Sequence, residues 1–178
     1  RLEIENPFRH ECTICDVGRF KTDAQAERNL QINPTARVEC YAEDVLTWSE
    51  ERLSDLMNRV DCIVATTDRM RVQLSAASIA HEYQIPAVFA GCYESAQGGE
   101  VFWQIPGSGQ PCYCCLRGGM AEPPRSRTLD YTLATDNEDY DGEPGLDAAV
   151  RAISMVAAQV TIATLLRDRD CKLSSVVN

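Results

Sequence analysis

The sequence predicts an α/β domain in which a mostly parallel sheet carries helices on both of its faces. Short apolar runs rich in β-branched residues alternate with longer helical stretches over residues 37–105. The chain has 178 residues, a length that fits one domain and can bury a sizeable core without disulfides. Hydrophobic residues make up 44% and charged residues 25% of the chain, which excludes a disordered or low-complexity protein.

The first part of the chain predicts a strand, a helix and a second strand. Apolar alternation over residues 1–4 indicates the end of a strand, which Pro7 interrupts because proline lacks a backbone donor. Thr22 is a suitable N-cap for a helix over residues 23–32. A strand over residues 37–41 is expected after it.

The remaining elements continue this alternation. Thr47 and Glu50 have the spacing of a capping box, which predicts a helix that ends at Met57. Apolar runs and helical periodicity then predict a buried strand over 60–66, a helix over 69–83, a buried strand over 86–92, a more open strand over 100–105, and a closing helix over 146–166.

Charge and cysteine content narrow the classes of function. The formal net charge of −10 repels phosphate, so broad binding to nucleic acid or to an anionic membrane is not expected. No unbroken apolar stretch is long enough to predict a membrane-spanning helix. The nine cysteines are odd in number and several lie in apolar runs, which favours a reducing cytosol over a secreted disulfide framework.

Three polar positions near the start of the chain are candidates for binding a phosphorylated ligand. Asn6 and Arg9 follow the first strand, where ligands of open α/β sheets bind. Arg9 could hold a phosphate and Asn6 a ribose or phosphate oxygen, although an ordinary surface ion pair explains a loop arginine equally simply. Lys21 lies at a helix N-terminus, where a cation is unfavourable unless an anion shares the site.

Asp68 stands at the carboxyl edge of the buried strand over residues 60–66. A carboxylate there can hold Mg²⁺ or orient a nucleotide phosphate through that metal. The same residue is a suitable N-cap for the helix over residues 69–83. The two roles are compatible.

Cys112 and Cys115 form a C-x-x-C pair that can supply two thiolates to a tetrahedral Zn²⁺. Zinc needs two further ligands, for which Cys114 and Cys171 are possible thiols. A redox function is the weaker interpretation, because the pair does not open a helix after a first strand.

These segments follow one another with an order and spacing seen in one family. They are Asn6-x-x-Arg9, Asp16-Val17-Gly18-x-x-Lys21, Ile32-Asn33-Pro34, the run from Asp61 to Asp68, Ile85-Pro86-Ala87-Val88, Gly98-Gly99-x-Val101 and Cys112-Tyr113-x-Cys115-Leu116. Over residues 1–116 the set resembles the ThiF/MoeB/HesA family of ubiquitin-activating-like enzymes, and Pro144-Gly145-Leu146 fits the start of that family's closing helix.

The resemblance implies a Rossmann-like adenylation domain that uses ATP and Mg²⁺ to adenylate the C-terminal carboxylate of a ubiquitin-like or sulfur-carrier protein. It also implies roles for four residues. Asn6 and Arg9 would contact the nucleotide, Lys21 would stabilise the phosphates, and Asp68 would hold the Mg²⁺. No general base is needed, because the carboxylate is itself the nucleophile.

The resemblance further implies one ThiF-like domain over residues 1–178, with a crossover and zinc-knuckle region at 107–145. Cys112 and Cys115 would be half of a structural zinc site. Residues 118–145, where related enzymes often carry a thioester-forming cysteine, contain no cysteine, so adenylation without thioester transfer is expected. The family's glycine-rich nucleotide loop is expected before Arg1, in a longer protein.

Two other functions remain open. A non-catalytic subunit of the same fold would bind a partner protein, as the inactive half of a heterodimeric activating enzyme does. A nicotinamide-linked oxidoreductase is disfavoured, because the chain has no G-x-G-x-x-G motif. We further expect a homodimer or a heterodimer with a related chain, and an acidic stretch at 136–147 that stays mobile until a basic partner docks.

Overall fold

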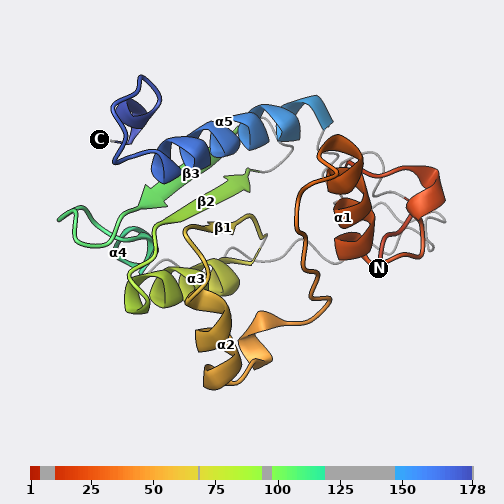
Figure 1. Cartoon of the computed structure of the whole chain (residues 1–178), viewed down its shortest axis with the longest axis horizontal. Coiled ribbons are helices and arrows are strands. Elements are labelled where there is room, and N and C mark those ends of the chain that lie inside the picture. The colour runs from red at the N-terminus through yellow and green to blue at the C-terminus, as the bar shows by residue number, and fades with distance from the viewer. Residues whose placement is uncertain (5–10, 68, 94–97, 119–146, 178) are drawn as a thin grey trace, which may run out of the picture. The chain divides into compact units, whose positions relative to one another are not determined.

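The computed structural model describes residues 1–4, 11–67, 69–93, 98–118 and 147–177 (Figure 1). The chain divides into two compact units, Arg1–Ser49 and Glu50–Asn178. Each unit is described below by itself.

The unit Arg1–Ser49 contains helix α1 (Lys21–Ile32) and the short 3₁₀ helices η2 (Ile14–Asp16) and η3 (Val45–Thr47). The predicted helix is confirmed, but it begins two residues earlier than expected, after an extended Phe20, and Thr22 lies in its first turn. It ends at Asn33, because the following Pro34 has no N–H to continue the ladder.

The strands predicted over residues 1–4 and 37–41 are wrong for the described part of this unit. Leu2 makes backbone hydrogen bonds with Gly18 and Arg19 of a turn, rather than with a neighbouring strand. Val38 and Cys40 alternate with charged residues as in a strand, yet both are exposed. Alternation alone does not make a strand where no second strand supplies hydrogen-bonding partners.

The unit Glu50–Asn178 is built on a sheet of order β1-β2-β3, formed by β1 (Ile63–Ala65), β2 (Ala87–Cys92) and β3 (Gly99–Gln104). β1 pairs with β2 in parallel, and β2 pairs with β3 in antiparallel. The α/β class is confirmed, while the described sheet is mixed rather than mostly parallel. The reason is the short β2–β3 connection, since a parallel pair requires a crossover of a dozen residues or more.

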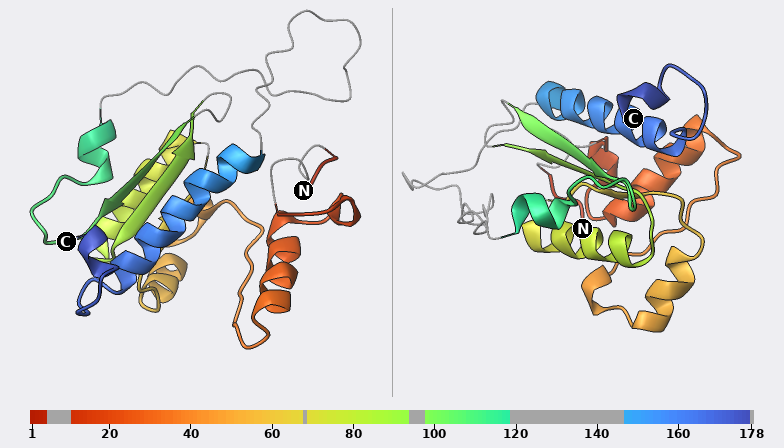
Figure 2. Two further views of the ribbon diagram at one scale, coloured as in Figure 1. Left: turned by 90° about the horizontal axis from the view of Figure 1, so that it is seen from above. Right: turned by 90° about the vertical axis from the view of Figure 1, so that its left-hand side faces the viewer.

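Helices cover both faces of this sheet, with α3 and α4 on one face and α5 on the other (Figure 2). The α-helices in the described part of the unit are α2 (Glu50–Met57), α3 (Met70–Glu82), α4 (Tyr113–Arg117) and α5 (Asp147–Leu165), and η6 (Ser174–Val176) follows them. Successive residues of β2 point to opposite faces. Phe89 therefore packs with Ala77 and Tyr113 on one side, and Val88 packs with Val160 on the other.

Two predicted details of these helices change. α2 ends at Met57 as expected, but it begins at Glu50 and not directly after Thr47. Thr47 belongs to η3, where its hydroxyl donates to the Asp44 carbonyl, so the predicted capping box is wrong. α3 has Arg69 as its N-cap and begins at Met70. The α4 helix was not predicted from the sequence.

α5 buries one face against the sheet and leaves an apolar face outside. Val160 and Ala163 are buried and Ile153 is half-buried, whereas Val156 is 47% and Met155 65% exposed. Among the described residues, α5 alone is long and apolar enough to cross a membrane by length and composition. The side chains on the inner face of α5 are buried against β2 and β3, as in a core helix.

Candidate functional site

The structure describes only part of the predicted nucleotide site. Lys21 is the first residue of α1, in the unit Arg1–Ser49. Asn6, Arg9 and Asp68 lie outside the described residues, with Asp68 between the described Thr67 and Arg69. The predicted convergence of Arg9, Lys21 and Asp68 therefore stays a prediction.

The start of α1 is set by a turn that folds back on Leu2. The Leu2 amide donates to the Arg19 carbonyl at 2.8 Å, and the Gly18 amide donates to the Leu2 carbonyl at 2.8 Å. Gly18 adopts φ 86°, a left-handed conformation that glycine reaches without steric cost. Because Leu2 is itself buried, this turn gives Lys21 a defined backbone to start from.

Charged hydrogen bonds join the same turn to the body of α1. The Asp16 carboxylate accepts from the Thr13 amide at 2.8 Å and from the Thr13 hydroxyl at 2.9 Å. Arg19 bridges from Asp16, at 2.8 Å, to Glu27 on α1, at 2.7 Å. The Thr13 amide, then its hydroxyl and the Arg19 guanidinium, hold the pKa of Asp16 below its ordinary value.

Lys21 brings a positive charge to the N-terminus of α1. The N-cap Phe20 supplies no side-chain hydrogen bond to the first-turn amides. Burial and the Asp16 charge raise the pKa of the neighbouring Cys12 thiol, and the Lys21 ammonium lowers it. An ammonium beside exposed helix amides can share a phosphate with them.

The carboxyl ends of β1 and β2 are held together by a buried side chain that sequence reasoning missed. The Gln73 amide on α3 donates to the Thr67 carbonyl at 2.8 Å and to the Ala90 carbonyl at 3.3 Å. The Tyr113 hydroxyl donates to the Gln73 amide oxygen at 2.5 Å. A signal was present, since Gln73 is a polar residue one turn before Ala77 on the buried face of the predicted helix.

The C-x-x-C pair opens α4. Cys112 is the N-cap of α4, and its sulfur lies 3.4 Å from that of Cys115. The Cys115 backbone amide is the main cause of a lowered pKa of Cys112, while the hydrogen bond that the Cys115 thiol shares with Cys112 raises the pKa of Cys115. The pair thus opens a helix, but this helix follows β3 and not a first strand, as the sequence predicted.

The predicted extra zinc ligands are not gathered around this pair. The Cys114 thiol donates to the Leu74 carbonyl of α3 at 3.6 Å and lies 3.7 Å from the Ser78 hydroxyl. The described residues contain no group of three or more His, Cys, Asp or Glu side chains that could hold a metal ion. Zinc is thus not supported by this part of the chain.

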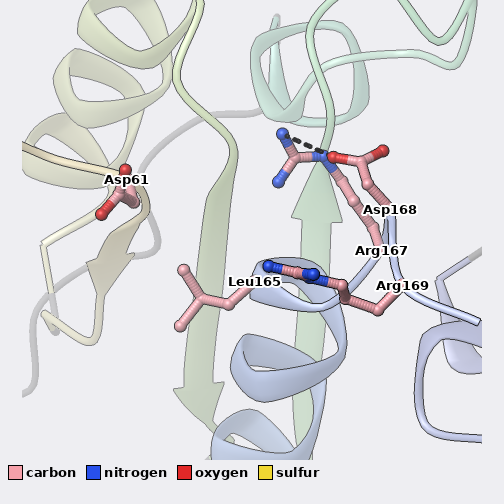
Figure 3. Close-up of a pocket in the computed structure, with 5 residues that line it drawn as sticks. All are labelled: Asp61, Leu165, Arg167, Asp168 and Arg169. Atoms are coloured by element: carbon pink, nitrogen blue, oxygen red, sulfur yellow. Dashed lines mark ion pairs between the residues drawn. The ribbon is translucent and has the colours of Figure 1, made fainter. Parts of the chain in front are cut away.

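A polar hollow of about 480 Å³ lies at the edge of the sheet opposite to the carboxyl end of β1 (Figure 3). Its lining residues are Asp61, Leu165, Arg167, Asp168 and Arg169. Asp61 precedes β1, so this hollow lies at the amino end of that strand, away from Thr67. Arg167 also pairs with Asp168 at 3.6 Å and donates to the Thr164 carbonyl at 3.0 Å. These contacts terminate α5, and the residues that line the hollow include none of those predicted to contact the nucleotide.

The family is decided by a match that runs along nearly the whole chain. The ThiF family model matches residues 1–177, including the turn before Lys21, the carboxyl ends of β1 and β2, and the C-x-x-C helix. The chain belongs to the ThiF family. Members of this family are typically adenylyltransferases that use ATP and Mg²⁺.

Solved structures share the ThiF fold with this chain. Two structures of MccB from E. coli, one of them with MccA-N7isoASN, align with a TM-score of 0.60 and sequence identities of 16% and 17%. The alignments cover 93% of this chain but only 46% and 45% of the MccB chains. The chain therefore spans less than half the length of these MccB chains, and the likeness establishes the fold alone. No curated protein matches the chain.

Proposed function

We propose that this ThiF-family chain is part of an enzyme that uses ATP and Mg²⁺ to adenylate a carboxylate of a peptide or of a small ubiquitin-like or sulfur-carrier protein. The observation that carries the proposal is the family match together with Lys21 at the start of α1, on a turn fixed by Leu2 and Gly18. Because such a turn is already folded, a cation on it can stabilise phosphate charge with no reorganisation of the protein during the reaction.

In the proposed reaction, a substrate carboxylate oxygen bonds to the α-phosphorus of ATP. The bond from that phosphorus to the bridging oxygen breaks, and pyrophosphate leaves with the electron pair. Lys21 neutralises the charge that grows on the phosphate oxygens. The main task of the protein is to hold the two reactants in line, because the carboxylate needs no activation.

The other roles are assigned through family resemblance. We propose that Asn6 and Arg9 contact the nucleotide and that Asp68 holds the Mg²⁺. A magnesium ion supplies further neutralisation of phosphate charge when it is bound. Thr67, the described residue before Asp68, follows β1 at the carboxyl edge of the sheet, where ligands of α/β folds bind.

The C-x-x-C pair is proposed to supply two of the four ligands of a structural zinc. Two sulfurs at 2.3 Å from a tetrahedral zinc lie roughly 3.8 Å apart, so the observed 3.4 Å fits after a small adjustment. The remaining ligands would come from outside the described residues. Elemental analysis of freshly purified protein tests this role, and protein without zinc contradicts it.

A dimer in the cytosol is the proposed assembly. The support is the outer face of α5, where Met155, Val156 and Ile162 are all exposed. Apolar side chains gathered on one helix face favour association. Light scattering at high micromolar concentration, with and without ATP, tests this assembly, and a monomer under both conditions contradicts it.

Lys21→Ala in the natural protein tests the proposed activity. We expect ATP–pyrophosphate exchange to fall about 100-fold, as for the loss of one preorganised charge-stabilising group. Binding of the carrier protein or peptide should be unchanged. Arg28→Ala is the matched control, because Arg28 is another exposed cation of α1, paired with Glu11 at 3.6 Å. An equal loss of activity in both variants, or no loss at Lys21→Ala, contradicts the role of Lys21.

A further inference from the structure

We propose that Gln73 is a positioning residue that, held in place by Tyr113, fixes the carboxyl ends of β1 and β2 against each other for nucleotide binding. The inference rests on the proposed adenylating function. It concerns residues for which neither the family match nor the MccB likeness supplies a role.

One buried amide group spans two strand ends. Gln73 is only 6% exposed, and its Nε2 donates to the Thr67 carbonyl after β1 and to the Ala90 carbonyl in β2. The register pairs Ala65 of β1 with Phe89, so Thr67 lies beyond the last ladder pair. Gln73 thus continues the connection between the two strands past the point where their backbone pairing stops.

Tyr113 fixes the orientation of the Gln73 side-chain amide. The Tyr113 hydroxyl donates to the Gln73 Oε1, which leaves the NH₂ group directed toward the two carbonyls. Burial raises the pKa of Tyr113, so its hydroxyl keeps the proton that it donates. Its ring is stacked on Phe89 with centroids 4.3 Å apart and planes 11° apart, and its amide donates to the Gln104 Oε1 at 3.0 Å.

This network gives the strand ends a stiffness that a short β1 does not supply alone. A displacement of about 1 Å at a reacting centre can cost on the order of 100-fold in rate. Tyr113 also lies between Cys112 and Cys115, so the C-x-x-C segment contributes a buried anchor to this edge as well as two thiols. The physical role of Gln73 is therefore to hold backbone, with no contact to substrate required.

Two variants and a matched control test the role. Gln73→Leu removes the bridge, and Tyr113→Phe keeps the ring but removes the hydroxyl that orients it. Thr164→Val is the control, because Thr164 is also buried and its hydroxyl donates to a backbone carbonyl, that of Val160. Thr164 lies on α5, on the opposite face of the sheet from the Gln73 network. In all three variants the free energy of unfolding, measured in urea, should fall by similar amounts, since each variant loses buried hydrogen bonding.

The decisive readout is amide hydrogen exchange at Thr66, Thr67 and Arg69. We expect exchange there to be about tenfold faster in Gln73→Leu and Tyr113→Phe than in Thr164→Val, by the loss of one or two buried hydrogen bonds at this site. The KM for Mg-ATP should rise about tenfold with a smaller change in kcat, because a binding surface is loosened while Lys21 is untouched.

Equal exchange rates at these amides in Gln73→Leu and Thr164→Val overturn the positioning role. So does an unchanged KM for Mg-ATP in an active protein. If the unaltered natural protein catalyses no ATP–pyrophosphate exchange, the proposed function fails, while the amide exchange result still decides by itself whether Gln73 holds the strand ends. Tyr113→Phe keeps the test available if Gln73→Leu does not fold.

Discussion

The two units of this chain are stabilised by different kinds of interaction. In the described part of Arg1–Ser49, the buried apolar residues are Leu2 and Ala24, and the turn before α1 is held by backbone bonds and charged hydrogen bonds. The unit Glu50–Asn178 instead has an apolar core on each face of its sheet, centred on Phe89 and Val88.

Because of this difference, the two parts of the proposed site should respond to different kinds of change. The turn that precedes Lys21 is held by polar contacts at the surface, which respond to pH and to backbone strain. The strand ends at Thr67 are oriented by Gln73 and by core packing, which respond to cavities and to added volume. Changes aimed at one unit should therefore leave local measurements in the other almost unaltered.

Phe89→Ala should give the largest effect. Phe89 is 1% exposed and stacks on Tyr113, so its removal leaves a cavity in the core of the sheet. We expect the free energy of unfolding of Glu50–Asn178, measured in urea, to fall by about 3–5 kcal/mol. Val64→Ala, at a side chain that is 48% exposed on β1, is the control and should cost far less. Similar losses in both variants would mean that Phe89 is not central to the core.

Gly99→Ala should give the next effect, in the same unit, through added volume. A Cβ at Gly99 would lie 2.5 Å from the Gly91 carbonyl and 2.8 Å from the Ile153 side chain of α5. We expect a loss of about 1–3 kcal/mol in unfolding free energy. Gly91→Ala is a matched control, since a Cβ there meets nothing within 4 Å. A Gly99 variant as stable as the Gly91 variant would contradict close packing of α5 on β3.

Gly18→Ala tests backbone strain in the other unit. A Cβ at Gly18 meets nothing within 4 Å, so the cost arises from the φ of +86° alone. We expect the opening free energy of the α1 amides, measured by hydrogen exchange, to fall by about 1–2 kcal/mol. Gly18→Asn should cost less, because asparagine tolerates this conformation. Protection at Val88 should not change, and a change there would contradict the separation of the two units.

Lowering the pH should give the smallest effect. The pKa of Asp16 in the folded chain lies below its ordinary value of 3.8, mainly because of the Thr13 amide. Its stabilising contribution is therefore complete well above pH 3.8 and is lost as the pH falls through the lowered value. Amide exchange at Gly18 should accelerate over that range, and Asp16→Asn should abolish the dependence. A dependence that survives in Asp16→Asn would assign it to another group.

Sequence patterns predicted elements well where the chain repeats a period. The strands near Val64 and Val88 and the helices α1, α3 and α5 were all expected, because their apolar residues recur at strand or helix spacing. The burial expected along the first of these strands was wrong, since Val64 is 48% exposed. The strand expected near Val38 failed, because alternation does not reveal whether a partner strand is present. α4 was missed because its five residues are too few to establish a helical period.

The sequence alone determined the family, the α/β class and the position of Lys21 at a helix start, since these depend on local order and spacing. Only the tertiary structure decided that Gln73 meets Thr67, Ala90 and Tyr113. Tyr113 stands 40 positions from Gln73 in the chain. Their contact depends on α3 and α4 packing on the same face of the sheet, which no pattern within either helix specifies.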